Sequence, residues 1–425
     1  MGATALLFVL AMGGPVLTLE EAVQTAETHQ PQLRQARAST QLAEARIDTS
    51  FAPLLPQVST SASYRRSTSN FAPQPGSSQR GATPGKNSLD TTDYWSFGIT
   101  ASQLIYDFGQ STGRYHVAQA NAEVSRANEE AAHQQVLLNA RTSFFSARAN
   151  KELVRVAEQT LGNQRRHMEQ VQAFVEVQTR PEIDLAQARL DLANAELLLV
   201  NAQNGYNTSK AQLNQAMGVA RDTNYEVADE TLAAVEGEDA ALDVLAQEAS
   251  RRPDIVALQR QIRAQELTIR SVKGAYFPTL SASTSLTDAG AQLDRMAWNW
   301  NGSVNLSWQL FGGNITRSQV REAEASLGVI HAQLQTAQQQ VRLAVEQARL
   351  AIRAAKAATA IAAVAVQNAT QRLALAEGRY QAGVGSIIEL GDAQLAFTNA
   401  QAQRVQSEYT LATARAQLLQ ALGRR

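Results

Sequence analysis

Four short segments of the chain alternate apolar and polar residues with a period of two, the pattern of β-strands that present two different faces. They form two pairs, one within residues 56–106 and one within residues 278–311. The opposite, polar face is made mostly of Ser, Thr and Asn, not of the Lys and Glu that usually solubilise an exposed sheet. The apolar face of the two strongest segments carries Trp298, Trp300, Val304, Leu306 and Trp308, and Trp95, Phe97 and Ile99. The pattern predicts two β-hairpins, and the Ser-, Gly- and Pro-rich stretch 67–93 predicts a long loop within the first.

Two interpretations of these hairpins are open. Their apolar face could cover a soluble core, or it could meet lipid while the polar face lines water. Each segment has about the 9–11 residues of a tilted membrane strand, with aromatic residues near its ends. The recurrence of the pattern and the uncharged polar face favour membrane strands. Because lipid does not tolerate an open sheet edge, such a sheet must close by oligomerisation. Two copies would give eight strands, and three would give twelve with room for a pore.

Two long stretches, from Thr112 to about Val177 and from Thr316 to about Gln381, contain no proline and little glycine. At roughly 65 residues each, they predict helices on the order of 100 Å long. Small residues recur every three or four positions in the second stretch, which predicts helices packed closely side by side. This seam is expected at Val341, Ala344, Ala348, Ala351, Ala355, Ala358 and Ala362.

The chain is an internal duplication of one unit: helix, hairpin, long helix, tight turn and returning helix. Pro31 and Pro56 are matched by Pro253 and Pro278 at a common offset of 222 residues. We predict a first repeat over residues 17–218, with its hairpin at 56–106 and its turn at 178–181. A joining segment follows at 219–250. The second repeat spans 251–425, with its hairpin at 278–311 and its turn at 382–386.

The first 16 residues are apolar and uncharged, like the hydrophobic region of a secretory signal peptide. No Lys or Arg precedes Arg34, and no clear cleavage site follows. We interpret residues 1–16 as a truncated signal peptide, with an ordinary buried start as the alternative. No other uncharged apolar run reaches the roughly 18 residues of a bilayer-spanning helix. Membrane passage would therefore fall to the strands.

Charge and composition narrow the function classes. The chain has 38 basic and 39 acidic residues, a net charge of −1, and no basic block of the kind that neutralises phosphates. Nucleic acid is therefore not an expected partner. It has no cysteine, and its five histidines are not spaced as metal ligands. Because no nucleophile elbow, phosphate loop or framed carboxylate pair occurs either, we expect no cofactor, no metal and no catalysis.

Acidic residues gather after the second predicted turn. Glu389 and Asp392 are three residues apart and share a helix face, and Asp184 has the equivalent place in the first repeat. In a single chain they read as an ordinary solvated face. In a ring of identical subunits each becomes a ring of acids that attracts cations and tunes an aperture.

The order of several motifs across both repeats resembles the TolC-type outer-membrane efflux proteins, over essentially the whole chain. The motifs are Leu17-Thr-Leu-Glu-Glu-Ala-Val, Arg252-Pro253-Asp254, Ala275-Tyr-Phe-Pro-Thr-Leu280, Leu310-Phe-Gly-Gly313 with its twin Ile105-Tyr-Asp-Phe-Gly109, and Gly391-Asp-Ala-Gln-Leu395. The resemblance implies an α+β membrane protein that forms a homotrimer. Its twelve-stranded β-barrel, with four strands per chain, would lie in the outer membrane of a Gram-negative bacterium and continue as an antiparallel α-helical barrel in the periplasm. Residues 219–249 would contribute to an equatorial belt.

The same resemblance implies a passive exit duct of a tripartite efflux or type I secretion system. Substrates would arrive from an inner-membrane pump or ABC exporter through a periplasmic adaptor (membrane fusion protein). The periplasmic gate would comprise Asp184, Tyr380, Glu389 and Asp392. The adaptor would dock on Thr179, Arg180 and Pro181 and on Gly383, Val384, Gly385 and Ser386. The best-known member has an arginine at the second turn where this chain has Gly385, so the bonds that close its tip are expected to differ.

Two rival functions belong to other classes. A soluble coiled-coil scaffold would use the hairpins only for assembly and would purify without detergent, whereas a barrel protein would fractionate with outer membranes. A membrane enzyme with a catalytic lumen is disfavoured by the absence of a clustered catalytic set.

Overall fold

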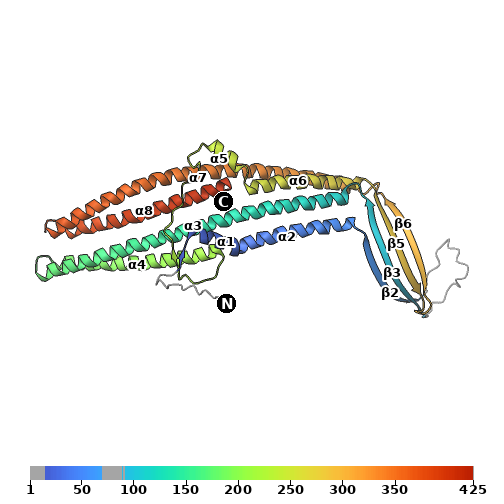
Figure 1. The fold of residues 1–425 in the computed structure, drawn as a ribbon, viewed down its shortest axis with the longest axis horizontal. Helices are drawn as coiled ribbons and strands as arrows, with labels where there is room; N and C mark the ends of the chain where they lie inside the picture. The colour runs from blue at the N-terminus through green and yellow to red at the C-terminus, as the bar shows by residue number, and fades with distance from the viewer. Residues whose placement is uncertain (1–14, 69–88, 90, 425) are drawn as a thin grey trace, which may run out of the picture. The chain divides into compact units, whose positions relative to one another are not determined.

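The computed structural model describes residues 15–68, 89 and 91–424. Its elements occur twice in the same order (Figure 1). The first series is α2 (Pro31–Phe51), η1 (Ala52–Leu54), β2 (Gln57–Thr68), β3 (Thr91–Tyr106), α3 (Gln110–Glu176) and α4 (Glu182–Met217). The second is α6 (Pro253–Lys273), η2 (Gly274–Tyr276), β5 (Thr279–Gly290), β6 (Ala297–Ser307), α7 (Ile315–Gln381) and α8 (Ile387–Leu422). Matching helices are equal in length: 21 residues for α2 and α6, 67 for α3 and α7, and 36 for α4 and α8. The second series thus reproduces the first element by element.

Four short elements lie outside these two series. They are β1 (Val16–Leu17), α1 (Leu19–His29), β4 (Glu226–Val227) and α5 (Leu242–Ala249). Strands β1 and β4 pair in parallel and place Val16 beside Glu226. Most of the predicted leader, residues 1–14, lies outside the described residues. Its last residue, Val16, belongs to a strand.

The chain divides into two compact units, and both repeats contribute to each. The first unit combines the chain up to Thr40 with Ser125–Leu258 and with the chain from Gln333 onward; the second combines Gln41–Val124 and Gln259–Ala332. The boundary between the two compact units therefore does not coincide with the boundary between the two repeats. The repeat boundaries remain predictions from the sequence.

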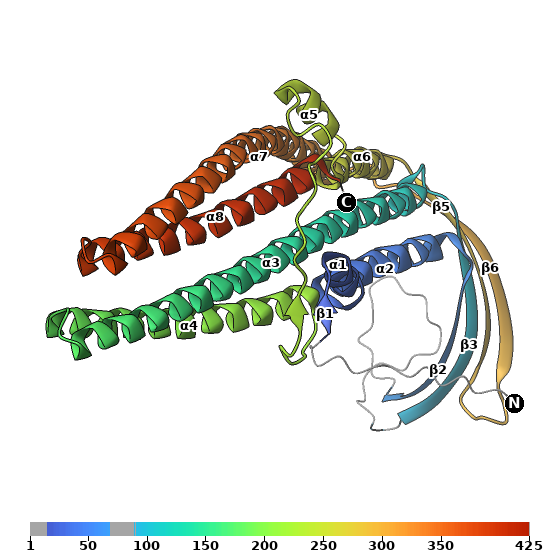
Figure 2. The same ribbon diagram turned by 60° about the vertical axis from the view of Figure 1, so that its left-hand side comes forward.

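The second unit contains a four-stranded antiparallel sheet in the order β2-β3-β5-β6, which curves along its strands (Figure 2). Strands β3 and β5, one from each repeat, join the two hairpins, so β2 and β6 are its edges. Both hairpins occur where the sequence predicted them. The loop predicted over 67–93 is shorter than expected, because strand pairing continues to Thr68 opposite Thr91; residues 69–88 and 90 of that loop lie outside the described residues.

The strand register gives the sheet two chemically different faces. Trp300 lies opposite Leu286, which lies opposite Ile99, so apolar residues of three strands share one face. On the other face Ser283 lies opposite Ser303, and their hydroxyl oxygens are 2.9 Å apart. The period of two in the sequence thus corresponds to an apolar and a hydroxyl-rich face.

Helix α7 carries a buried stripe with spacings of three and four residues, the spacing of a heptad seam. Its buried members are Val341, Val345, Ala348, Ile352, Ala355, Ala362, Ala369, Leu373, Ala376 and Tyr380. Val341, Val345, Ala348 and Ile352 pack in one cluster with buried residues of α8, and Ala369, Leu373, Ala376 and Tyr380 pack in a second. Ala344 and Ala351 of the predicted seam are half-buried and pack against the first of these clusters, whereas Ala358 is exposed, so the prediction was wrong there. The prediction missed Val345 and Ile352, which follow Val341 and Ala348 by four residues and are fully buried.

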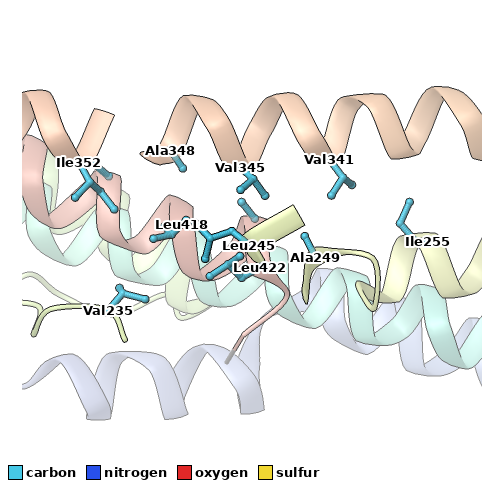
Figure 3. Close-up of a cluster of buried hydrophobic side chains, with 12 residues drawn as sticks. Val235, Leu245, Ala249, Ile255, Val341, Val345, Ala348, Ile352, Leu418 and Leu422 are labelled. Atoms are coloured by element: carbon cyan, nitrogen blue, oxygen red, sulfur yellow. The ribbon is translucent and has the colours of Figure 1, made fainter. Parts of the chain in front are cut away.

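The joining segment covers part of this helical core. Val235, Leu245 and Ala249 of the segment pack with Val345 of α7 and Leu418 of α8 (Figure 3). Such burial of branched side chains contributes roughly 1.5–3 kcal/mol for each large residue relative to exposure. The segment is therefore held by apolar contact with both helices.

A buried carboxylate adds a polar anchor to the same segment. Glu238 is 4% exposed, and its two carboxylate oxygens accept hydrogen bonds from Arg415 at 3.1 and 3.2 Å. Lys356 Nζ lies 2.8 Å from the same carboxylate. Burial raises the pKa of Glu238, but the hydrogen bonds from Arg415 and Lys356 outweigh it and bring the pKa to about 2. Glu238 is therefore ionised, and its ion pairs with Lys356 and Arg415 connect the joining segment to helices α7 and α8.

One described helix meets the length and hydropathy requirements of a membrane span. It is α7, in which an 18-residue stretch has a mean hydropathy of 1.4 and at most two charged residues. It was not predicted from the sequence, because charged residues interrupt its apolar stretches. Of that 18-residue stretch, 17% is buried within the chain.

Candidate functional site

The first candidate site residues lie in the turn between α3 and α4. Gln178 has a φ of 57°, which reverses the chain after α3. The backbone N–H and the hydroxyl of Thr179 both donate to the carbonyl oxygen of Phe174, at 2.9 and 2.8 Å. Pro181, with extended backbone angles, is the N-cap of α4. A proline fits there because its fixed φ suits a helix start and no N–H is lost from the helix.

The second turn, between α7 and α8, depends on two glycines. Gly383 has a φ of 79°, a conformation that favours glycine. A Cβ atom on Gly385 would lie 2.9 Å from the backbone nitrogen of Tyr380, so the turn closes against the end of α7 only with glycine there. Ser386 caps α8, and its hydroxyl accepts a hydrogen bond from the N–H of Glu389 at 3.1 Å. The absence of an arginine at Gly385 therefore has a steric reason.

Arg180 connects the two turns. Its guanidinium group donates to the carbonyl oxygens of Tyr380 and Gly385, each at 3.3 Å. Its Cζ atom also lies 4.6 Å from the centroid of the Tyr380 ring. A cation over an aromatic face and charge-assisted hydrogen bonds are both stabilising contacts. We call this set of contacts between Arg180, Tyr380 and Gly385 the tip clamp.

Tyr380 is the centre of a small core at the two turns. It is 2% exposed and packs with Val171 of α3, Ala188 of α4 and Leu390 of α8. Its hydroxyl has no hydrogen-bond partner among the described residues. Burial raises the pKa of Tyr380, and the nearby charge of Asp184 raises it further. The structure thus brings together two predicted gate residues, Asp184 and Tyr380, without a hydrogen bond from the tyrosine hydroxyl.

The three acidic residues have different surroundings. Asp184 is buried, with 8% exposed. Glu389 is half-exposed and forms an ion pair with Arg379 at 3.2 Å. Asp392 is exposed. Arg379 was not anticipated from the sequence, although its place one turn before Gly383 near the acid-rich start of α8 could have indicated the pair.

A polar cavity of about 170 Å³ opens beside Tyr380. It is lined by residues of α3, α7 and α8: Asn163, Arg166, His167, Gln170, Glu377, Tyr380, Gln381, Leu390 and Gln394. Below it, the Gln164 side-chain amide donates to the Gln394 side-chain oxygen at 2.9 Å. No sequence pattern predicted this cavity, because α3 is about 200 residues from α7 and α8, which supply its other walls.

The predicted lipid-facing residues are exposed on the sheet. Trp298, Trp300, Val304 and Leu306 are each more than 60% exposed, although large apolar side chains are normally buried. Ile99, Phe97 and Trp308 are between 42% and 57% exposed. Trp95 is half-buried because its ring packs on Tyr64, with centroids 4.5 Å apart. A sheet face with so many exposed large apolar side chains marks a surface that meets lipid or another protein.

No metal-binding group is evident within the described ranges. Among those residues no three or more His, Cys, Asp or Glu side chains are grouped as they would be to hold a metal ion. The expectation of no cofactor rests on the sequence alone.

A sheet with one apolar and one hydroxyl-rich face, joined to long helices that reverse at two tight turns, is the arrangement of outer-membrane channel proteins with a helical extension. The sequence profile of the family described as "Outer membrane efflux protein" matches residues 22–219 and 244–424. The chain belongs to this family. It is therefore an outer-membrane transport protein and not an enzyme.

Curated relatives agree with this assignment. The chain is 25% identical to the outer membrane protein TolC of Escherichia coli over 429 residues, which cover 95% of this chain and 82% of TolC. It is 25% identical over 169 residues to the outer membrane protein OprJ of Pseudomonas aeruginosa and 24% identical over 252 residues to the probable outer membrane lipoprotein SilC of Salmonella typhimurium. Those two matches span 36% and 56% of this chain and only 34% and 52% of the relatives' own lengths.

Solved structures share the fold. The crystal structure of CusC superposes with a TM-score of 0.83 at 18% identity, covering 98% of this chain and 95% of CusC. The Campylobacter jejuni CmeC outer membrane channel superposes with a TM-score of 0.83 at 19% identity, covering 95% of this chain and 85% of CmeC. At these identities the likeness concerns the fold alone.

Proposed function

We propose that three copies of this chain form the exit duct of a tripartite efflux or type I secretion system. The observation that supports this most is the sheet with its exposed apolar face and open edges β2 and β6. In lipid an unpaired edge leaves backbone groups without partners, so β2 of one copy must pair with β6 of the next. Three copies give twelve strands and a lumen, whereas two give eight strands whose interior is filled by side chains.

The duct is passive, and its substrates come from an inner-membrane pump or ABC exporter through a periplasmic adaptor. The adaptor docks on the two turns, at Thr179, Arg180 and Pro181 and at Gly383, Val384, Gly385 and Ser386. Val384 is 69% exposed, so the second turn offers an apolar contact. Arg180, however, is engaged in the tip clamp, so an adaptor that contacts it competes with bonds inside the chain.

The gate comprises Asp184, Tyr380, Glu389 and Asp392. Tyr380 and Asp184 belong to the buried side of the turns, and Glu389 and Asp392 to the accessible side. In the trimer the accessible acids repeat about the axis and attract cations to the aperture. The tip clamp holds the two turns of each chain together and keeps the aperture narrow.

The test is to express the chain in a Gram-negative host and fractionate the membranes. We expect it in the outer membrane as a trimer that runs as such in cold detergent gels and dissociates on heating. Purified trimers should form channels in planar lipid bilayers. Recovery in the soluble fraction without detergent would instead support the coiled-coil scaffold, which family membership otherwise sets aside.

The partners need a separate test. Photo-crosslinkers at Arg180 and Val384 should capture an adaptor from the periplasm, whereas a crosslinker at the exposed Leu343, far along α7 from the turn, serves as the control. Equal capture from all three positions would contradict docking at the turns.

A further inference from the structure

His167 of α3 is a buried histidine that the proposed function does not use. It is 5% exposed. Its ring meets the ring of Tyr380 in a T-shaped contact, with centroids 5.2 Å apart and planes at 70°. His29, His116 and His331 are exposed, and His133 lies 2.9 Å from Glu27. His167 is thus the histidine whose charge state bears directly on the tip clamp.

The groups around His167 set its preference for the neutral form. Burial lowers the pKa of His167, and the charges of Asp191 and Asp184 on α4 oppose this only in part. Arg166 on α3 and Glu377 on α7 line the same cavity, Arg180 lies over the Tyr380 ring, and α8 contributes the uncharged Leu390 and Gln394. The charges around His167 are therefore of mixed sign, and burial is the largest influence on its pKa.

The cavity gives protons a route to this histidine. His167 and Tyr380 both line it, together with the accessible side chains of Arg166 and Gln381. A polar cavity of about 170 Å³ is large enough for water molecules with several polar partners. A histidine in a dry core exchanges protons only when the core opens, whereas one beside a wet cavity responds to the pH of the compartment.

We propose that His167 is a proton-responsive positioning residue of the tip clamp. When His167 is neutral, its ring packs against Tyr380, and Arg180 supplies the positive charge over the Tyr380 ring. When protonated, it places a second positive charge against the ring that Arg180 already faces, and the two cations repel. The clamp then loosens, and the turns separate more readily. This inference rests on the proposed exit-duct function, in which the clamp keeps the aperture narrow.

The direction of the pH dependence follows from linkage. An isolated histidine has a pKa of about 6.5, and that of His167 in the closed packing is lower. The loosened or unfolded tip therefore binds more protons than the closed tip between these two values. Closed packing is fully favoured above pH ~6.5 and loses stability as the pH falls toward the lower pKa. A difference of one pKa unit corresponds to about a tenfold change in the ratio of open to closed tips.

The experiment compares channel conductance of purified trimers in planar bilayers at about pH 7.5 and about pH 5.5, the range in which histidine titrates. The variants are the native chain, His167→Gln, His167→Lys and the control His116→Gln, an exposed histidine on the same helix. We expect the native chain and His116→Gln to conduct several-fold more at the lower pH. His167→Gln should lose this response, and His167→Lys should conduct at the high level at both values.

The acids Glu389 and Asp392 are present in every variant, so a pH response that they cause is common to all four. A response in His167→Gln equal to that of the native chain overturns the assignment, and so does His167→Lys with low conductance at both values. Circular dichroism and trimer gels show whether each variant is folded. If the folded native trimer forms no channel at all, the exit-duct function itself fails, and the His167 assignment fails with it.

Discussion

The guanidinium group of Arg180, in the turn between α3 and α4, donates a hydrogen bond of 3.3 Å to the carbonyl oxygen of Gly385, in the turn between α7 and α8. The two residues occupy corresponding turns of the two repeats. The bond needs glycine at 385, where a Cβ would strike α7, and a cation supplied from the other repeat. The sequence alone did not show which bonds hold the tip closed at Gly385. In the structure, Arg180 of the first turn donates a hydrogen bond there.

Removing that donor should loosen the tip. Arg180→Ala deletes two charge-assisted hydrogen bonds and the stacking on Tyr380, which together are worth about 1–3 kcal/mol for partly exposed contacts. We expect higher single-channel conductance with unchanged trimer formation. Arg189→Ala, an exposed arginine of α4, is the matched control and should behave as the native chain. Equal conductance for both variants would mean that the clamp does not restrain the aperture.

Adding one methyl group at Gly385 should have a similar effect by steric means. Gly385→Ala forces its Cβ against the Tyr380 backbone and should destabilise the closed tip by about 1–3 kcal/mol, as overpacking does. Gly378→Ala makes the same chemical change in α7 where nothing lies within 4 Å. It should be neutral or stabilising by up to about 1 kcal/mol, because alanine favours helix. Thermal unfolding in detergent and channel conductance distinguish the two.

Neutralising the accessible acids should change how cations act on the channel. The double variant Glu389→Gln with Asp392→Asn removes two negative charges per chain near the turn and leaves Arg379 without its partner. We expect weaker block by Mg²⁺ in planar bilayers and altered conductance. Glu408→Gln, farther along α8, should leave the block unchanged. Unaltered block in the double variant would remove Glu389 and Asp392 from the gate.

The buried carboxylate of Glu238 should be a major stabilising group. Glu238→Gln leaves the cations of Arg415 and Lys356 without their counter-charge, and breaking such a buried pair costs about 3–5 kcal/mol. Asp243→Asn breaks the ion pair with Arg342, whose side chains are 84% and 59% exposed, and should cost less than about 1 kcal/mol. Similar thermal midpoints for the two variants would contradict the role given to Glu238.

The same group predicts an acid dependence. The pKa of Glu238 is about 2, below its ordinary value of 4.5, so the unfolded chain takes up this proton first. Its contribution is present above pH 4.5 and is lost as the pH falls toward 2. Thermal midpoints measured across this range should fall for the native chain and change less for Glu238→Gln.

The two faces of the sheet should respond oppositely to charge. Trp300→Arg places a cation on the apolar face, which costs about 2–4 kcal/mol near the middle of a bilayer. We expect poor assembly in the outer membrane. Asn301→Arg, one residue away on the hydroxyl-rich face, should assemble normally and shift ion selectivity toward anions. Normal assembly of Trp300→Arg would assign the apolar face to something other than lipid.

Much of the architecture was predictable because it depends on local periodicity. A period of two in Trp298, Trp300 and Val304 indicated a strand with one apolar face, and the absence of proline indicated the length of α3 and α7. The prolines at 31 and 253 marked equivalent helix starts, and α2 and α6 begin at these two residues. Each of these features depends only on residues within one element and its immediate neighbours, so the sequence pattern is sufficient to predict it.

The tip was decided by tertiary structure, because its contacts join residues that are distant in sequence. Arg180 and Gly385 are 205 residues apart, and His167 meets Tyr380 only because α3 and α7 pack there. Sequence spacing identified the turns and the acids but could not assign a partner to Arg180, which the family resemblance placed on the docking surface. Nor could it choose Val345 over Ala344 for the seam of α7, since both spacings fit a helix. Local pattern determines which elements form and which face is apolar; which side chains meet across them depends on packing between the elements.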